Sequence, residues 1–136
     1  MKETYFPTLE EALLLHNILI DRFSGSHGVL DLGLLESALA RPRSGYYPTL
    51  ASQAAALMQS LAKNHAFADG NKRIAFALTA SFLFLNEFKL ACSANDGEEF
   101  MLRLAGSITG SITGSITVIS IQEIASWLEN RMKRIG

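Results

Sequence analysis

The residues best suited to chemistry lie close together, in the stretch from His65 to Arg73. It reads His-Ala-Phe-Ala-Asp-Gly-Asn-Lys-Arg, so five of its nine side chains are polar or charged. An imidazole can act as a general base, and the Asp69 carboxylate can hold a magnesium ion together with substrate phosphates. Lys72 and Arg73 supply positive charge, and a guanidinium can bind a phosphate through two hydrogen bonds. Together these residue types predict a site that handles phosphate groups.

The backbone of the same stretch adds a second reason to expect an anion. A helix is predicted to begin at Asn71, so consecutive amides and the positive end of the helix dipole face the loop. Gly70 lets a ligand approach the backbone closely. Each residue alone has a plainer explanation, because aspartate is a common N-cap and Gly-Asn a common turn. We favour the phosphate site because all these features occur within nine residues.

Six helices are expected to position this loop. Five of the six predicted starts carry an N-cap or a capping box, in which a hydroxyl or carboxylate satisfies an unpaired backbone amide. The capping residues are Thr8 with Glu11, Asp31, Thr49, Asp96 with Glu99, and Ser120 with Glu123. The predicted helices cover residues 9–23, 32–40, 50–64 and 71–88, then a fifth from about 95 and a last one from 121 through Arg131, Lys133 and Arg134. The site loop therefore joins the third and fourth helices.

The fourth helix is apolar on nearly every side. Between Ile74 and Leu85 only Thr79 and Ser81 are polar, so the helix has no polar face to expose to solvent. Twelve residues fall short of the roughly 20 that cross a bilayer. We therefore predict an all-α bundle of about six helices packed around this central apolar helix.

Composition supports one helical domain over residues 1–136. The chain has 20 Leu and 17 Ala against 2 Val, a balance that favours helix over strand. A formal net charge of −1 excludes a strongly basic nucleic-acid-binding protein. The single cysteine cannot form an internal disulfide, which predicts a reducing, cytoplasmic location. The first residues show no basic segment followed by an apolar stretch, so we expect no secretion signal, and we also expect no membrane attachment.

The sequence Gly-Ser-Ile-Thr occurs three times in succession between Gly106 and Thr117. A period of four places the isoleucines on one helical face, but glycine, serine and threonine all disfavour a helix interior. We interpret the repeat as a tandem expansion that lengthens the connection into the last helix. A loop is the favoured conformation, and an added helical turn or two is the alternative.

The stretch from His65 to Arg73 resembles the signature of the Fic/Doc superfamily, His-x-Phe-x-(Asp/Glu)-Gly-Asn-(Gly/Lys)-Arg, at all seven fixed positions. The segments 31–42 and 124–128 are similar to the early part and the closing helix of the Doc, or death-on-curing, branch. The resemblance spans the chain apart from the Gly-Ser-Ile-Thr repeat. It implies a Fic-like helical fold with the active-site loop between helices three and four.

The resemblance also implies a role for each residue of the loop. His65 would deprotonate a target hydroxyl, and Phe67 would fix the loop by packing into the core. Asp69 would hold Mg²⁺. The nucleotide-binding residues would be Gly70 and Asn71 through their amides, Lys72 beside them, and Arg73, which holds the ATP phosphates and belongs with His65 to the catalytic pair.

Two departures from the AMP-transferring Fic pattern bear on the reaction. Lys72 replaces a glycine, and Phe76 stands where a second arginine is expected. Both match Doc-like proteins, which are thought to bind ATP reversed and to transfer the γ-phosphoryl group to a Ser/Thr hydroxyl. The resemblance thus implies a kinase-like toxin that inhibits translation, with elongation factor Tu as the type of target. AMP transfer on the same fold is the first alternative, and a catalytically silent interaction module is the second.

Regulation by a separate protein is the remaining expectation. The inhibitory pattern (Ser/Thr)-x-x-x-Glu-(Gly/Asn) of some Fic proteins fails here, because Ala125 precedes Glu129 and Asn130. Doc-like toxins use an antitoxin whose C-terminal segment folds into a groove, and we expect such a partner. His16 is predicted to be a satisfied polar residue of the bundle, His27 a solvated turn residue, and Cys92 an unreactive thiol.

Overall fold

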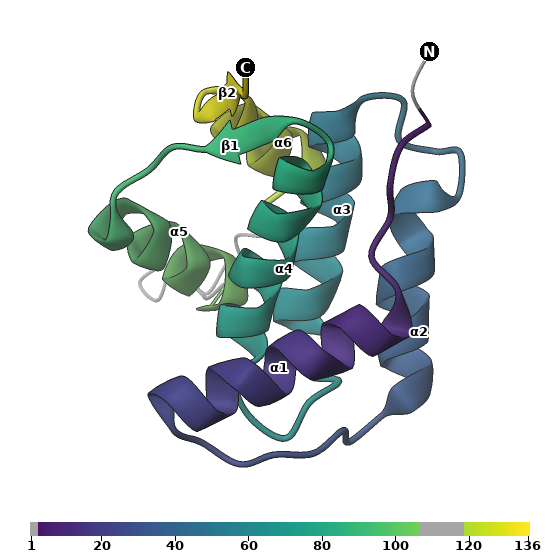
Figure 1. Ribbon diagram of the computed structural model, residues 1–136, viewed down its shortest axis with the longest axis vertical. Coiled ribbons are helices and arrows are strands. Elements are labelled where there is room, and N and C mark those ends of the chain that lie inside the picture. Colours follow the sequence, from purple (N-terminus) through teal and green to yellow (C-terminus); the bar gives the residue numbers. More distant parts are fainter. Residues whose placement is uncertain (1–2, 107–118) are drawn as a thin grey trace, which may run out of the picture.

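The computed structural model describes residues 3–106 and 119–136, and helices dominate these residues (Figure 1). The elements are α1 (Leu9–Phe23), α2 (Leu32–Ala40), the 3₁₀ helix η1 (Arg41–Arg43), α3 (Leu50–Lys63), α4 (Asn71–Leu85), β1 (Phe88–Leu90), α5 (Ala94–Gly106), α6 (Ile121–Glu129) and β2 (Met132–Arg134). The all-α bundle of six helices is confirmed, and the loop at residues 64–70 joins α3 to α4 as predicted.

The helices α3 and α4 form the centre of the bundle, side by side in Figure 1. Alanines fill much of the buried surface of α3, and such small side chains let neighbouring helices approach closely. Along α4 the buried residues include Ile74, Leu78 and Phe82, while Phe84 and Leu85 near its end are exposed. Because α1 crosses beside α4 and α2 packs beside α3, the loop that joins the central pair lies next to both outer helices.

Most predicted helix starts are confirmed by their hydrogen bonds. Capping boxes are present at Thr8 with Glu11 and at Ser120 with Glu123, and the Asp31 side chain caps α2. The box at Thr49 uses Ser52 as its second member. Such a cap contributes about 1 kcal/mol to stability. These starts depend only on residues three apart in sequence, which explains why they could be predicted.

A further contact strengthens the start of α1. The Tyr5 hydroxyl donates a hydrogen bond of 2.5 Å to Glu11 Oε1, the oxygen that also accepts from the Thr8 amide. This hydrogen bond holds the pKa of the Glu11 carboxyl below its ordinary value. The segment before α1 is thereby tied to the helix.

The fourth helix ends at Leu85, three residues before the predicted end. The Asn86 side chain donates to the Phe82 carbonyl (2.8 Å) and also to the Tyr5 carbonyl (2.8 Å), and Glu87 adopts a left-handed φ of 76°. Tertiary contact with the N-terminal segment therefore ends a helix whose apolar pattern would have carried it further.

The last helix is also shorter than predicted. It ends at Glu129, and Met132–Arg134 form β2, which pairs antiparallel with β1. Lys133 and Arg134 thus lie on a strand rather than in the final helical turns. The two strands are three residues each and more than forty residues apart in sequence, so no local pattern indicates their pairing.

The predicted capping box of Asp96 with Glu99 is wrong. α5 begins at Ala94, and the Asp96 amide donates to the Ser93 hydroxyl. The Asp96 carboxylate instead accepts from Arg131 Nε at 2.7 Å, and the Arg131 guanidinium lies over the Trp127 ring. Arg131, predicted to lie in the last helix, therefore follows α6 and joins α5 to the segment after it.

Two other expectations concern the repeat and attachment to a membrane. The Gly-Ser-Ile-Thr repeat lies, after Gly106, outside the described residues. Among the residues that are described, none of the helices combines the length and the apolar character needed to span a bilayer.

Thr79 offers a test of packing in α4. Its side chain is fully buried, and within the described part of the chain its hydroxyl has no hydrogen-bond partner. Thr79→Val replaces that hydroxyl by a methyl group of the same shape, so we expect the free energy of unfolding to rise by about 1 kcal/mol. The corresponding rise in Tm is about 3 °C by calorimetry.

Thr79→Ser is the matched control, because it keeps the hydroxyl and removes the methyl group, and it should lower stability by about 1 kcal/mol. A Tm of Thr79→Val below that of the native chain would mean that the hydroxyl is hydrogen-bonded in solution.

Candidate active site

The loop between α3 and α4 is anchored by Phe67. Its side chain is 1% exposed, and its ring stacks on the ring of His16 from α1, with 3.8 Å between the centroids. Burial of a phenylalanine of this size contributes about 2 kcal/mol. The predicted structural role of Phe67 is confirmed, and the loop is fixed at its middle.

His16 holds the loop a second time. Its Nε2 lies 2.8 Å from the Asp69 carbonyl oxygen, so this nitrogen carries the hydrogen and donates. The side chain is 2% exposed, which confirms the predicted satisfied polar residue of the bundle. Its contact with the loop was not predicted, because nothing in the sequence pairs a residue of α1 with one 53 positions later.

The Asn71 side chain closes the loop on itself. Its Oδ1 accepts from the Phe67 amide (3.1 Å), and its Nδ2 donates to the Phe67 carbonyl (3.0 Å). Both polar groups of the carboxamide are therefore engaged with one residue of the loop. The part of Asn71 that remains for the expected nucleotide role is its backbone amide.

A segment before α2 supports the other side of the loop. The amides of Leu30 and Asp31 donate to the Ala66 carbonyl, at 2.8 and 3.1 Å, and the Ala68 amide donates to the Gly28 carbonyl at 3.0 Å. These bonds form an antiparallel bridge between Val29 and Phe67. Sequence reasoning missed this support, because the glycines and serines of residues 24–28 indicate only a turn and no pattern pairs Val29 with Phe67.

The start of α4 has the form expected of an anion site. Gly70 is in the left-handed conformation (φ 74°), and no side chain caps the helix. The amides of Asn71, Lys72 and Arg73 point out of the first turn, and no acceptor for them occurs among residues 3–106 and 119–136. A Cβ at Gly70 would lie 3.1 Å from Ile20 Cδ1, so a larger residue would crowd α1. These amides are available to an anionic ligand.

The Asp69 carboxylate lies beside these amides. Its Oδ1 accepts from the Gly70 amide (2.9 Å), and its Oδ2 accepts from the Ser26 amide (3.2 Å). The residue is exposed, and each oxygen keeps a further lone pair. In the described parts of the chain, no three His, Cys, Asp or Glu side chains form a metal-binding group. One carboxylate suits Mg²⁺ that takes its other ligands from phosphates and water, so the residues fit the expected ion.

The two expected cations lie on the first turn of α4. Lys72 and Arg73 are both exposed, and the Arg73 guanidinium lies over the Phe23 ring at the end of α1, 4.8 Å from its centroid. A cation stacked on an aromatic ring keeps its hydrogen-bonding edge free. Arg73 is therefore held near the loop while its N–H groups remain available.

His65 opens the loop with an unusual backbone. Its φ is 52°, a conformation that costs a non-glycine residue about 1–2 kcal/mol. The residue is exposed, and its ring makes no hydrogen bond or ion pair with any residue the structure describes. Strain of this kind at an unbonded imidazole is typical of functional positions.

The other candidate residues take structural places. The His27 ring, predicted to be solvated, is only half exposed, and both of its nitrogens contact α1, at Asn17 and Asp21. Cys92 is partly buried, and burial, aided by the nearby Asp96 carboxylate, raises the pKa of its thiol. A raised thiol pKa leaves little thiolate at neutral pH, in agreement with the predicted unreactive cysteine.

Comparison with known proteins gives two matches. The model of the Fic/DOC family matches residues 6–83, a range that runs from the segment before α1 to near the end of α4. The protein "Toxin Doc" of Mycolicibacterium smegmatis (strain ATCC 700084 / mc(2)155) is 50% identical over 74 residues. That alignment covers 51% of this chain and 57% of the relative, so the chain spans little more than half the length of that protein.

Asn71 provides a test of how the loop is held. Asn71→Ala removes both hydrogen bonds to Phe67 and leaves a buried residue with unpaired backbone groups, so we expect a loss of about 2 kcal/mol in denaturant unfolding. Hydrogen exchange at the Phe67 amide should also become faster.

Asn71→Asp keeps an acceptor for the Phe67 amide and places a negative charge in the first turn of α4, so its loss should be smaller, about 1 kcal/mol. Equal stabilities of the two variants would contradict a closing role for the carboxamide.

Proposed function

This chain belongs to the Fic/DOC family, and we propose that it transfers the γ-phosphoryl group of Mg·ATP to a Ser or Thr hydroxyl of a protein target. The observation that carries the proposal is the pairing of an uncapped helix start at Gly70 with an unbonded, strained histidine at the other end of the same anchored loop. Phosphoryl transfer to a hydroxyl requires a protein to bind the phosphates and to accept the proton of the hydroxyl.

In the proposed reaction, His65 accepts the proton of the target hydroxyl. The hydroxyl oxygen forms a bond to the γ-phosphorus while the bond from that phosphorus to the β,γ-bridging oxygen breaks, and ADP leaves with the electron pair. The amides of the first turn of α4 and the Arg73 guanidinium balance the negative charge of the phosphates. Lys72 adds charge at the rim of the same turn.

Asp69 is the residue that would hold Mg²⁺. When bound there, the ion would neutralise charge on the phosphates and orient them. The chain's own contribution is the orientation of the carboxylate, whose two oxygens already accept hydrogen bonds from Gly70 and Ser26. Little reorganisation is then needed when the ion and nucleotide arrive.

The choice of γ-phosphoryl rather than AMP transfer is supported by two positions on α4. Phe76, where AMP-transferring relatives are expected to carry a second arginine, faces α5, and a Cβ at Gly97 would lie 3.0 Å from its ring. It therefore offers no charge to a nucleotide. Lys72 brings a long side chain to the turn where the α-phosphate would otherwise lie. A reversed nucleotide with its γ-phosphate nearest the hydroxyl avoids both difficulties.

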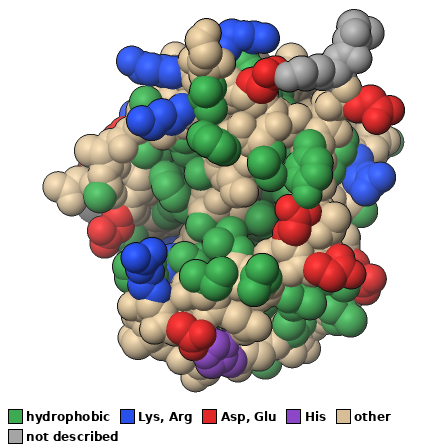
Figure 2. Space-filling view, viewed as in Figure 1, with side chains coloured by type: hydrophobic (Ala, Val, Ile, Leu, Met, Phe, Trp, Pro, Cys, Tyr) green, Lys and Arg blue, Asp and Glu red, His purple; other side chains and the backbone are tan. Residues whose placement is uncertain are grey.

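We further propose that the protein acts as the toxin of a toxin–antitoxin pair in the cytoplasm. The relative named Toxin Doc supports this assignment, and an elongation factor of the Tu type is the target that the resemblance implies. The antitoxin segment would occupy a shallow apolar groove lined by Tyr5, Leu14, Ile18 and Leu85 on the face of α1 and α4. Hydrophobic side chains are exposed on this face (Figure 2), and the apolar side of an amphipathic helix would cover them.

His65→Ala tests the proton acceptor. We expect the rate of label transfer from γ-labelled ATP to fall at least about 100-fold, the usual contribution of a general base. The Tm should stay within about 2 °C of the native value, because the ring is exposed and makes no described contact. Retained transfer, or retained growth inhibition at equal expression, would contradict the role of His65.

The same assay separates the alternatives. α-Labelled ATP should leave no label on the target, since label from the α-position would indicate AMP transfer. A silent interaction module would bind no Mg·ATP, so nucleotide binding that Arg73→Ala removes would count against it.

Lys72→Gly tests how the nucleotide is oriented. Removing the side chain opens the turn to the α-phosphate, so we expect part of the product to change from phosphorylated to AMP-modified target. Intact-mass spectrometry distinguishes the two products, and Lys72→Arg, which keeps a long cation, should leave the product unchanged. An active Lys72→Gly variant that yields only phosphorylated target would show that Lys72 does not select the orientation.

A further inference from the structure

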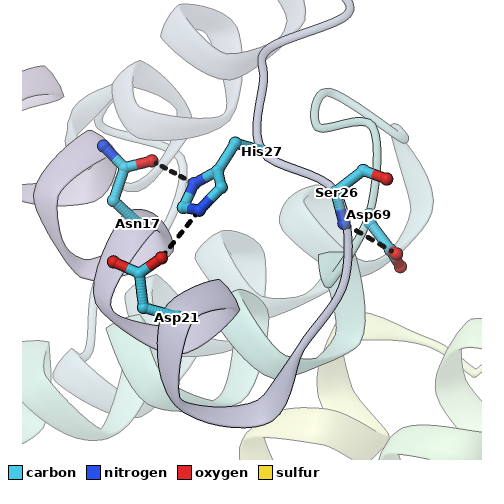
Figure 3. Close-up of polar contacts among 5 residues, drawn as sticks. All are labelled: Asn17, Asp21, Ser26, His27 and Asp69. Atoms are coloured by element: carbon cyan, nitrogen blue, oxygen red, sulfur yellow. Dashed lines mark hydrogen bonds and ion pairs between the residues drawn. The ribbon is translucent and has the colours of Figure 1, made fainter.

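The Asp69 carboxylate has a partner outside the signature stretch. The segment 24–28, which follows α1, passes beside the loop, and the Ser26 amide donates to Asp69 Oδ2 at 3.2 Å (Figure 3). This segment belongs to neither α1 nor α2, and all its residues are exposed. A backbone amide on an exposed turn directs a carboxylate reliably only if something else fixes the turn.

His27, the next residue, fixes the turn to α1. Its Nε2 lies 2.8 Å from Asp21 Oδ1, and its Nδ1 lies 3.0 Å from Asn17 Oδ1. Asn17 and Asp21 are four residues apart, so they lie on one face of α1, and the imidazole reaches between them (Figure 3). A carboxylate and a carboxamide therefore engage both ring nitrogens at once.

The backbone between α1 and His27 passes close to Asp69. Ser24 and Gly25 both have positive φ, 70° and 125°. A Cβ at Gly25 would lie 2.9 Å from Asp69 Oδ2, closer than ordinary contact allows. The turn thus approaches Asp69 through a residue without a side chain, and His27 holds its far end.

We propose that His27 is a positioning residue for Asp69, acting through the Ser26 amide. This inference rests on the proposed function, in which Asp69 holds Mg²⁺ for ATP. His27 itself touches neither group. With the turn fixed, Asp69 Oδ2 accepts from Ser26 while Oδ1 accepts from Gly70, so the carboxylate plane is set before any ion binds. Outer residues of this kind commonly tune a metal ligand.

The test measures ATP binding to the full chain by calorimetry, with and without Mg²⁺. In His27→Ala we expect the Mg²⁺ concentration that gives half-maximal enhancement of binding to rise about tenfold, as for loss of an outer partner of a metal ligand. ATP affinity without Mg²⁺ should be unchanged, because the amides and Arg73 are not altered. His27→Gln, which can still donate to Asp21, should recover most of the Mg²⁺ response.

A second pair of variants tests the route. If His27 acts through the bond to α1, Asp21→Ala should shift the Mg²⁺ response in the same direction, and the double variant should add little to either single change. A loss of ATP affinity that is equal with and without Mg²⁺ would mean a general structural role and would overturn the inference.

Hydrogen exchange separates this inference from the proposed function, because it needs no nucleotide. In His27→Ala the Ser26 and Gly70 amides should exchange faster than in the native chain, while the Phe67 amide should not. If the native chain binds no Mg·ATP, the proposed function fails, and the exchange result alone decides whether His27 holds Asp69. If the Ser26 and Gly70 amides exchange at the same rate in His27→Ala as in the native chain, the positioning role is overturned.

Discussion

The burial of Phe67 is the contact on which the rest of the site depends. A loop of polar residues between two apolar helices has no buried contact of its own that would stabilise one conformation over the others in water. With one aromatic ring inside the core and stacked on His16, the backbone on both sides of it becomes fixed. His16 then binds the Asp69 carbonyl, and Asn71 binds the Phe67 backbone, so the loop is held from inside the bundle while its functional groups remain at the surface.

The same arrangement divides the residues of the signature by role. Phe67 and the Asn71 side chain maintain the loop, whereas Asp69, Lys72 and Arg73 lie at the surface beside the uncapped turn. His65 lies at the opposite end of the loop in a left-handed conformation that is unusual for a residue with a side chain. The signature therefore combines fold and chemistry within nine residues, and substitutions at its structural positions would disturb the chemistry indirectly.

Much of the fold was predictable because it depends on short-range signals. The helix starts at Thr8, Asp31 and Ser120 use caps three residues apart, and the apolar run of α4 indicated its central place. Predictions were wrong where contacts between distant residues determine the structure. Asn86, just after the end of α4, hydrogen-bonds to Tyr5, and Asp96 binds Arg131 instead of capping its helix. The strand β1 pairs with β2, which is more than forty residues away in sequence. A local pattern carries no information about such partners.

The sequence by itself determined the helical class, through its composition and its capping residues along the chain. It also determined the position of the loop and the chemical groups that the loop displays, through the spacing of residues within one segment. Only the tertiary structure decided what surrounds that loop. The stacking of His16, the bridge from Val29 to Phe67 and the bond from Ser26 to Asp69 each join residues about 40 or more positions apart. Such contacts depend on how α1 lies against α4, and that placement follows from the packing of the whole core rather than from any one segment.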